Sequence, residues 1–138
     1  MKILAALDQT QSAQAVLAKA IKTARQQNAK LEILVVAENF ADVGDVFDYG
    51  NVNERLLESA KAAAKGYKEQ ALAQGVRAKA LVASGPSPAD SIVKHAEDEN
   101  LDLIVLGRRA KKGLDRFIIG SVAQRVVAHA PCSVLVVR

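Results

Sequence analysis

The sequence predicts an α/β protein in which a parallel sheet lies between two layers of helices. Short aliphatic runs, each too brief for a helix, alternate along the chain with longer segments whose apolar residues recur at helical spacing. Such alternation favours parallel strands joined by right-handed crossovers, with helices on both faces of the sheet. The chain has 138 residues, half of them apolar, so we expect one domain over residues 1–138 with a complete core.

Two strands and two helices are predicted in the first half of the chain. Residues 2–7 form an apolar run, and after a polar turn the apolar residues recur at helical spacing over residues 13–24. Residues 31–37 form the second strand. A long helix is expected from about residue 51 to residue 74, closed near Gly75.

The second half continues the same alternation. Residues 76–83 alternate between polar and apolar, which is typical of an exposed or edge strand. Residues 87–90 form a capping sequence with proline at the first helical position, and residues 103–106 are a buried strand. A capping box that starts at Ser121 opens a helix through Ala128. Residues 134–137 form the last strand.

Composition excludes several classes of partner. The net charge is +4, but no aromatic residues are interleaved with the basic ones for base stacking, so we expect no nucleic-acid partner. No apolar run is long enough to cross a membrane, and no signal-peptide pattern follows Met1, so we expect no membrane partner. The single cysteine, Cys132, suits a reducing compartment, and we expect a cytoplasmic protein.

The most informative segment joins the fourth strand to the last helix. Gly107 ends a buried strand, and Gly120 and Ser121 precede a helix. Small residues let a backbone approach a ligand, and a helix N-terminus directs N–H groups at an anion, so the segment predicts a phosphate-binding loop. The segment also contains a cluster of basic residues, which either create a positive field that attracts phosphate or are simply solvated. These residues are Arg108, Arg109, Lys111, Lys112 and Arg116.

The ends of other strands carry further candidate groups. Asp8 follows the first strand, residues 36–38 end the second, and Gly107 ends the fourth. Ligands of open parallel sheets bind beyond the carboxyl ends of the strands, where the strand order reverses. We therefore expect these residues to share one binding site.

Enzymatic signatures are missing. The sequence has no G-x-x-x-x-G-K-[ST] loop, no G-x-G-x-x-G after the first strand and no nucleophile elbow. We expect no catalytic residues and no metal ligands, and at most weak hydrolysis of a bound phosphate compound. Acidic residues between positions 38 and 50 lack the spacing of a calcium loop, which leaves a lid or a partner contact as alternatives.

The chain resembles the universal stress proteins over its whole length. That family's nucleotide motif is a glycine, two residues, a glycine, nine residues, then glycine and serine or threonine, and Gly107, Gly120 and Ser121 match it, while Ala110 replaces the second glycine. The resemblance implies a three-layer, Rossmann-like sandwich of the adenine nucleotide alpha hydrolase type. Its five-stranded parallel sheet would have the order 3-2-1-4-5. Members are typically homodimers, and those with the motif typically bind ATP.

The resemblance also implies roles for individual residues. Asp8 would contact the adenosine, Thr10 would cap the first helix, and the main chain of Val36 would pair with adenine. The other positions would surround the ribose and phosphates: Leu106, Gly107, Arg109, Ala110, Gly120, Ser121 and Val122. The alternative for Asp8 and Ser121 is that each only caps a helix.

Alanine at position 110 leaves two alternatives open. If this position needs a positive φ, alanine is strained by roughly 1 kcal/mol and its methyl group crowds a phosphate; with a negative φ, alanine is harmless. The leading interpretation is an ATP-binding stress or signalling module, with Mg, AMP, ADP or cyclic AMP as related ligands. The alternatives are a family member that binds no nucleotide and acts as an interaction dimer, and a slow ATPase or cyclic AMP binder.

The two expected edge strands differ in charge. Residues 133–138 form an apolar strand without a charge before Arg138, whereas Arg77 and Lys79 punctuate the third strand. Bare apolar edges pair with other chains, and charged ones discourage pairing. We expect a homodimer through residues 133–138, as the resemblance also implies.

Overall fold

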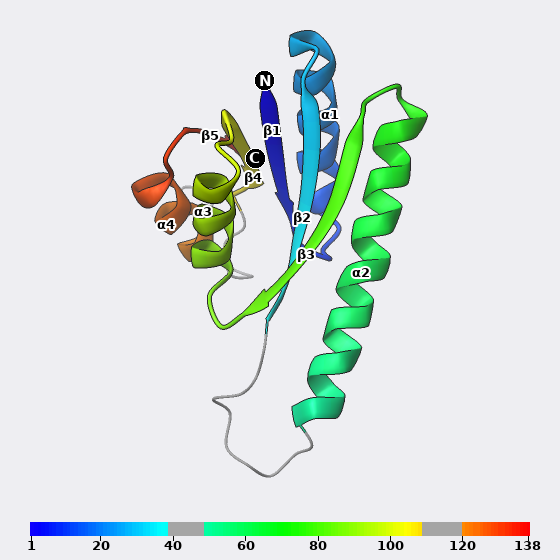
Figure 1. Cartoon of the computed structure of the whole chain (residues 1–138), viewed down its shortest axis with the longest axis vertical. Coiled ribbons are helices and arrows are strands. Elements are labelled where there is room, and N and C mark those ends of the chain that lie inside the picture. Colours follow the sequence, from blue (N-terminus) through cyan, green and yellow to red (C-terminus); the bar gives the residue numbers. More distant parts are fainter. Residues whose placement is uncertain (39–48, 109–119) are drawn as a thin grey trace.

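A computed structural model describes residues 1–38, 49–108 and 120–138 of the chain. It contains a five-stranded parallel sheet with the order β3-β2-β1-β4-β5, as predicted (Figure 1). The strands are β1 (Lys2–Leu7), β2 (Lys30–Glu38), β3 (Ala78–Gly85), β4 (Leu103–Gly107) and β5 (Ser133–Val137). The helices are α1 (Ala13–Gln27), α2 (Tyr49–Ala73), α3 (Pro88–Asp98) and α4 (Ser121–His129).

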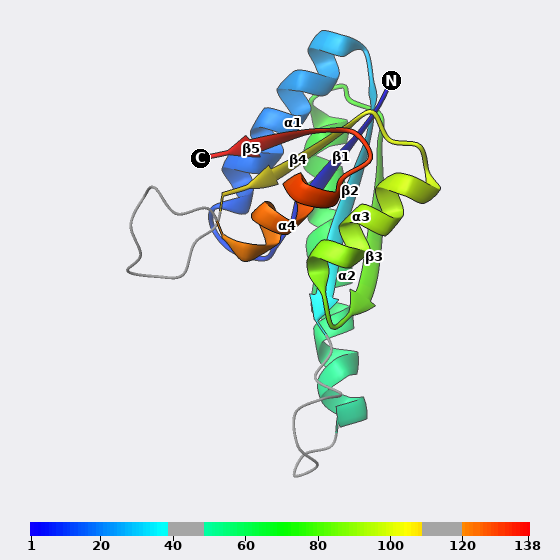
Figure 2. The same ribbon diagram turned by 90° about the vertical axis from the view of Figure 1, so that its left-hand side faces the viewer.

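The helices form two layers, so the predicted three-layer sandwich is present (Figures 1 and 2). Helices α1 and α2 pack on one face of the sheet, and α3 and α4 pack on the other. A hydrophobic core lies on each face of the sheet, and successive residues of a strand belong to opposite cores. In β1, Ile3 and Ala5 lie in the core with α1, whereas Leu4 lies in the core with α3 and α4. Because β1 is covered on both faces, it reads as a continuous apolar run rather than an alternating one.

Helix starts agree with the sequence only in part. Helix α3 begins as predicted, because the Ser87 side chain accepts a hydrogen bond from the Asp90 N–H at 3.3 Å and proline follows the cap. The prediction that Ser121 caps α4 is wrong, since Gly120 is the N-cap and Ser121 is the first helical residue. Capping of α1 by Thr10 is also wrong: Ser12 is the N-cap and makes no side-chain capping bond.

The start of β3 lies two residues later than predicted. Gly75 has φ +80° and ends α2, as expected, because only glycine adopts this left-handed conformation without strain. The Val76 N–H then bonds to the Ala71 carbonyl at 3.1 Å, which ties it to the end of the helix rather than to the sheet. Pairing with β2 starts at Ala78.

One polar contact lies beneath α3. Glu32 on β2 is only 8% exposed, and its Oε1 lies 2.9 Å from Nε2 of His95 on α3. A buried carboxyl group needs such a partner, because burial without one carries a large desolvation penalty. The pair therefore fixes α3 over the sheet at one register.

Candidate functional site

The candidate site lies at the carboxyl end of the central strand. Leu7 of β1 pairs with Val35 of β2, and Ala6 pairs with Leu106 of β4. The next residues on the two flanking strands, Val36 and Gly107, therefore lie on either side of the point where the chain leaves β1 at Asp8. This is the point where the strand order reverses, and ligands of open α/β sheets bind there.

The loop after β1 is held by its own side chains. Oδ1 of Asp8 accepts hydrogen bonds from the Thr10 N–H at 2.9 Å and from the Thr10 hydroxyl at 2.5 Å. The Thr10 hydroxyl also lies 2.7 Å from that of Ser12. Asp8 thus forms an Asx turn rather than a helix cap, and Thr10 orients the Asp8 carboxylate. Sequence reasoning placed both residues in the site and assigned Thr10 the wrong partner.

Packing explains the glycine at the end of β4. A Cβ atom on Gly107 would lie 3.1 Å from Cγ2 of Val16, which is tighter than an ordinary contact. The missing side chain at residue 107 therefore leaves room for helix α1 to approach β4 closely. Leu106, one residue earlier, is buried at 3% exposure, so its side chain belongs to the core beneath the site.

Two backbone hydrogen bonds join the described ends of the segment that links β4 to α4. The Arg108 N–H donates to the Val137 carbonyl at 2.9 Å, and the Gly120 N–H donates to the Arg108 carbonyl at 2.9 Å. The Gly120 N–H is therefore already used, which corrects the expectation that it would face a phosphate. Gly120 has φ −61°, a value open to any residue, so backbone strain does not explain this glycine.

The first turn of α4 offers N–H groups beside this segment. The first intrahelical bond runs from the Gln124 N–H to the Gly120 carbonyl at 3.0 Å, so the N–H groups of the preceding turn have no partner within the helix. Ser121 and Val122 belong to this turn and are exposed. A helix N-terminus carries about half a positive charge, which favours an anion there.

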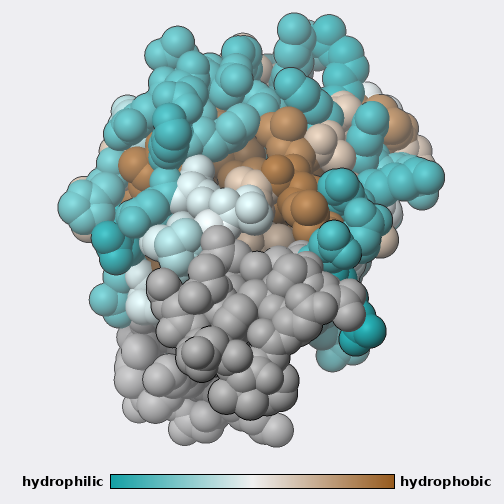
Figure 3. Space-filling view, turned by 60° about the horizontal axis from the view of Figure 1, so that its bottom comes forward, coloured by the Kyte–Doolittle hydropathy of each residue, from teal (hydrophilic) through white to brown (hydrophobic). Residues whose placement is uncertain are grey.

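The surface at this end of the sheet includes an apolar patch among the described residues. Figure 3 views the molecule from the lower end of Figure 1, toward which β2 and β3 run, and shows this patch with hydrophilic side chains above and beside it. Such a surface suits the flat face of a nucleobase, while the border can serve ribose and phosphate.

Some predicted site residues lie outside the described ranges. These are Arg109 and Ala110, together with Lys111, Lys112 and Arg116, and most of the acidic segment 38–50. Among the residues that the structure describes, no group of three or more His, Cys, Asp or Glu side chains could hold a metal ion. No helix in the same ranges is long and apolar enough to span a membrane.

Helix α2 contributes contacts that sequence reasoning missed. The Tyr67 hydroxyl donates to the Asp8 carbonyl at 2.8 Å, and the Ser59 hydroxyl donates to Oε1 of Gln9 at 2.6 Å. Burial and the nearby Asp8 carboxylate raise the pKa of the Tyr67 phenol above its usual value. The spacing of Tyr67 within a helical stripe of alanines could have predicted its burial, but not its bond to Asp8.

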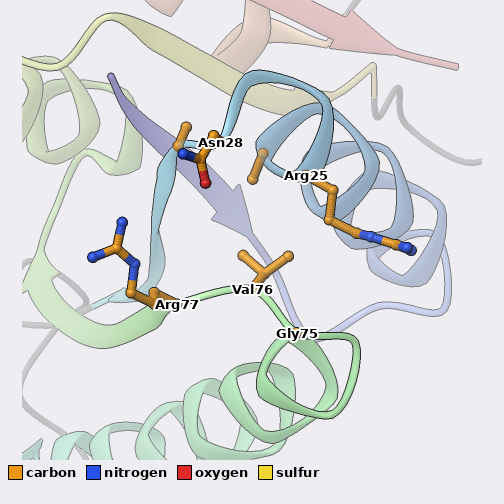
Figure 4. Close-up of a pocket in the computed structure, with 7 residues that line it drawn as sticks. Arg25, Asn28, Gly75, Val76 and Arg77 are labelled. Atoms are coloured by element: carbon orange, nitrogen blue, oxygen red, sulfur yellow. The ribbon is translucent and has the colours of Figure 1, made fainter.

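A separate hollow lies at the other end of the sheet. It has a volume of about 220 Å³ and is lined by the end of α1 and the turn before β3. Figure 4 shows that the Arg25 and Arg77 guanidinium groups point in different directions away from Val76, so they do not converge on one ligand. We therefore place the candidate site at the carboxyl end of the strands.

Comparisons with known proteins agree on one family. A model described as the universal stress protein family matches residues 1–138. A protein of Staphylococcus aureus strain USA300 that is named as a universal stress protein is 36% identical over 138 residues, which cover 99% of this chain and 82% of the relative.

Solved structures of this family have the same fold. Universal stress protein UspA from Lactobacillus plantarum superposes with a TM-score of 0.80 at 30% identity, covering 100% of this chain and 97% of that one. A universal stress protein from Archaeoglobus fulgidus in complex with dAMP gives 0.74 at 23% identity, covering 100% and 98%. A universal stress protein in complex with cAMP gives 0.72 at 19% identity, covering 100% and 97%.

Proposed function

Because this chain belongs to the universal stress protein family, we propose that it binds an adenine nucleotide, with ATP as the principal ligand, at the carboxyl end of its sheet. One observation carries the proposal: the strand register brings Asp8, Val36 and Gly107 together where the strand order reverses. The α4 N-terminus follows Gly120, whose backbone is bonded to Arg108 at the end of β4. These residues and the α4 N-terminus would provide partners for the base, the ribose and the phosphate chain of a nucleotide.

Each part of the nucleotide has a proposed contact. The Val36 main chain pairs with the adenine edge, and the Asp8 carboxylate accepts a hydrogen bond from the adenosine. The phosphates lie at the first turn of α4, where Ser121 offers a hydroxyl group and Ser121 and Val122 offer N–H groups. Arg109 and Ala110 complete the proposed phosphate contacts, and a Mg ion would be held chiefly by the phosphates themselves.

Two structural neighbours support adenine nucleotides as the ligand class. The proteins in complex with dAMP and cAMP share this fold, at 23% and 19% identity. At such identities the likeness concerns the fold, so the choice among ATP, ADP, AMP and cAMP depends on this chain's own residues. Position 110 is decisive here, because it lies in the family's phosphate motif.

The proposal includes assembly and compartment. We propose that β5, an edge strand, pairs with the β5 of a second copy, and that the homodimer acts as a cytoplasmic stress or signalling module. The single thiol, Cys132, is compatible with a reducing compartment.

Direct ligand analysis tests the nucleotide proposal. The purified protein is denatured, any released nucleotide is identified by chromatography, and refolded protein is titrated with Mg·ATP, ADP, AMP and cAMP by calorimetry. We expect binding of at least one of these nucleotides, with ATP tightest. No heat and no thermal shift at millimolar concentrations of all four would overturn the proposal.

A glycine variant separates binding from folding. Gly120→Val keeps an allowed φ but adds bulk before the first turn of α4, so it should abolish nucleotide binding while the protein stays folded. Gly66→Val is the matched control, because a Cβ on Gly66 has nothing within 4 Å. Equal affinities of the two variants would contradict the proposed phosphate position.

A further inference from the structure

Helix α2 contacts the first loop of the candidate site at two points. The Tyr67 hydroxyl bonds to the Asp8 carbonyl at 2.8 Å, and the Ser59 hydroxyl bonds to the Gln9 side chain at 2.6 Å. The bonded residues are 59 and 50 positions apart in the chain. These contacts therefore link α2 to the loop after β1, which is distant from it in the sequence.

The buried side of α2 shows that Tyr67 is an exception. Three residues on this side are alanines, namely Ala60, Ala64 and Ala71, each at most 2% exposed. Small side chains let the helix lie close to β2 and β3. Tyr67, at 8% exposure, is the one aromatic residue in this stripe of the described helix, and its hydroxyl reaches the loop. Packing alone would be served by phenylalanine.

The two contacts act on neighbouring residues of the same loop: Tyr67 holds the backbone carbonyl of Asp8, and Ser59 holds the side chain of Gln9. Rotation of the peptide between Asp8 and Gln9 would carry the Asp8 carbonyl away from Tyr67. The next peptide of the loop is held by the Asp8 side chain, whose Oδ1 accepts from the Thr10 N–H at 2.9 Å. Tyr67 and Ser59 thus restrain the backbone and one side chain of the loop, within which Thr10 holds the Asp8 carboxylate.

From this geometry we propose that Tyr67 and Ser59 are positioning residues, which hold the Asp8–Thr10 loop in the conformation that receives an adenosine. The proposal rests on the proposed nucleotide site but concerns residues that touch no ligand. It predicts that ligand affinity depends on a hydroxyl group of α2. By reciprocity, a bound nucleotide should also change the surroundings of that hydroxyl.

Affinity measurements test the dependence. Tyr67→Phe removes only the hydroxyl group, and we expect it to weaken nucleotide binding by about threefold to tenfold, the worth of one neutral hydrogen bond. Ser59→Ala should have a smaller effect, because its bond is made to an exposed side chain. Thr23→Val is the matched control: its hydroxyl bonds to the Lys19 carbonyl at 2.8 Å within α1, and its loss should leave affinity unchanged.

A purely structural role for Tyr67 would give a different result. Stability would then fall in Tyr67→Phe, as judged by thermal unfolding, while calorimetry at a temperature where the variant is fully folded would give the wild-type dissociation constant. That result would overturn the proposal, as would an equal loss of affinity in Thr23→Val.

A ligand-free measurement separates this proposal from the nucleotide site itself. In ¹H–¹⁵N spectra of the free protein, Tyr67→Phe should shift the Gln9 and Thr10 amide signals and increase their fast motion, and Thr23→Val should not. Unchanged loop signals would overturn the proposal whether or not the protein binds nucleotide. If the wild type binds none, the proposed function fails by itself and the loop spectra still decide whether α2 orders the loop.

The reciprocal effect has its own reporter. The chain has no tryptophan and only two tyrosines, Tyr49 and Tyr67, so 3-fluorotyrosine gives two ¹⁹F signals that Tyr49→Phe assigns. We expect AMP to shift the Tyr67 signal with the same dissociation constant that calorimetry reports. A signal that stays fixed through saturation would contradict the coupling between α2 and the loop.

Discussion

At the scale of single residues, Tyr67 links stability to pH. Burial, and then the Asp8 carboxylate, raise the pKa of its phenol in the folded protein above the value of about 10 that it has when unfolded. The folded state therefore favours the protonated phenol. The stability from this group is full below pH 10 and is lost as the pH rises through the folded pKa.

Unfolding in urea at several pH values checks this sign. Between pH 8 and pH 11 the wild type should lose stability faster than Tyr67→Phe, because the variant has no phenol to ionise. The difference between the two proteins isolates Tyr67 from the lysines that also titrate in this range. Tyr49→Phe serves as the control, and parallel stability curves for wild type and Tyr67→Phe would refute the assignment.

Gly107 illustrates how packing fixes a residue type. Its missing Cβ leaves room for Val16, whose Cγ2 would be 3.1 Å away from it. We expect Gly107→Ala to destabilise the protein by about 1 kcal/mol, the lower range for overpacking a well-filled core. Urea unfolding gives the value.

A double variant tests the stated cause. Val16→Ala removes the methyl group that the new Cβ would meet, so its combination with Gly107→Ala should be less destabilised than the sum of the two single changes. Strict additivity would mean that the strain arises elsewhere.

At the scale of helices and strands, the glycine inside α2 and the glycine just after its end should respond in opposite ways. Gly66 lies inside the helix with open space where a Cβ would be, so Gly66→Ala should stabilise the protein by about 0.5–1 kcal/mol. Gly75 has φ +80°, where alanine is strained, so Gly75→Ala should destabilise it by about 1 kcal/mol or more. Thermal unfolding of both variants measures the effects, and a shared sign would contradict the conformations described.

Element positions followed from sequence because period and length are local properties. The strict alternation of short apolar runs and helical segments placed all nine described elements, and α2 lies within two residues of its predicted start. The N-cap residues of α1 and α4, which are Ser12 and Gly120, were not predicted. Polar residues near both helix starts are suited to capping. Which residue becomes the N-cap depends on tertiary contacts, such as the bond between the Gly120 N–H and the Arg108 carbonyl.

The candidate site was predictable to the extent that it follows from topology. Asp8, Val36 and Gly107 end adjacent strands, so the strand order alone brings them together. The contributions of Tyr67 and Ser59 could not be predicted in the same way. They depend on the angle at which α2 crosses the sheet, which its spacing pattern does not encode. The pair between Glu32 and His95 was likewise not predictable, because it depends on how α3 lies over the sheet.

At the scale of the whole molecule, the sheet leaves one apolar edge. Strand β5 pairs with β4 on one side, and its register matches Val137 to Gly107. The Val137 carbonyl accepts from the Arg108 N–H, so the backbone groups of residue 137 face β4. In a parallel ladder alternate residues face opposite sides, and the backbone of Leu135 therefore also faces β4, whereas those of Val134 and Val136 face outward.

The alternation of inward- and outward-facing residues in β5 indicates which substitution tests the proposed homodimer. Val136→Pro removes an outward N–H that antiparallel pairing of two β5 strands would use, without removing a bond to β4, and should give a monomer. Leu135→Pro is the matched comparison, because it removes a bond within the sheet and should destabilise the fold itself. Light scattering on dilute wild-type protein should give about twice the chain mass of 14.7 kDa. A wild type of 14.7 kDa, or a Val136→Pro protein that stays dimeric, would show that β5 is not the interface.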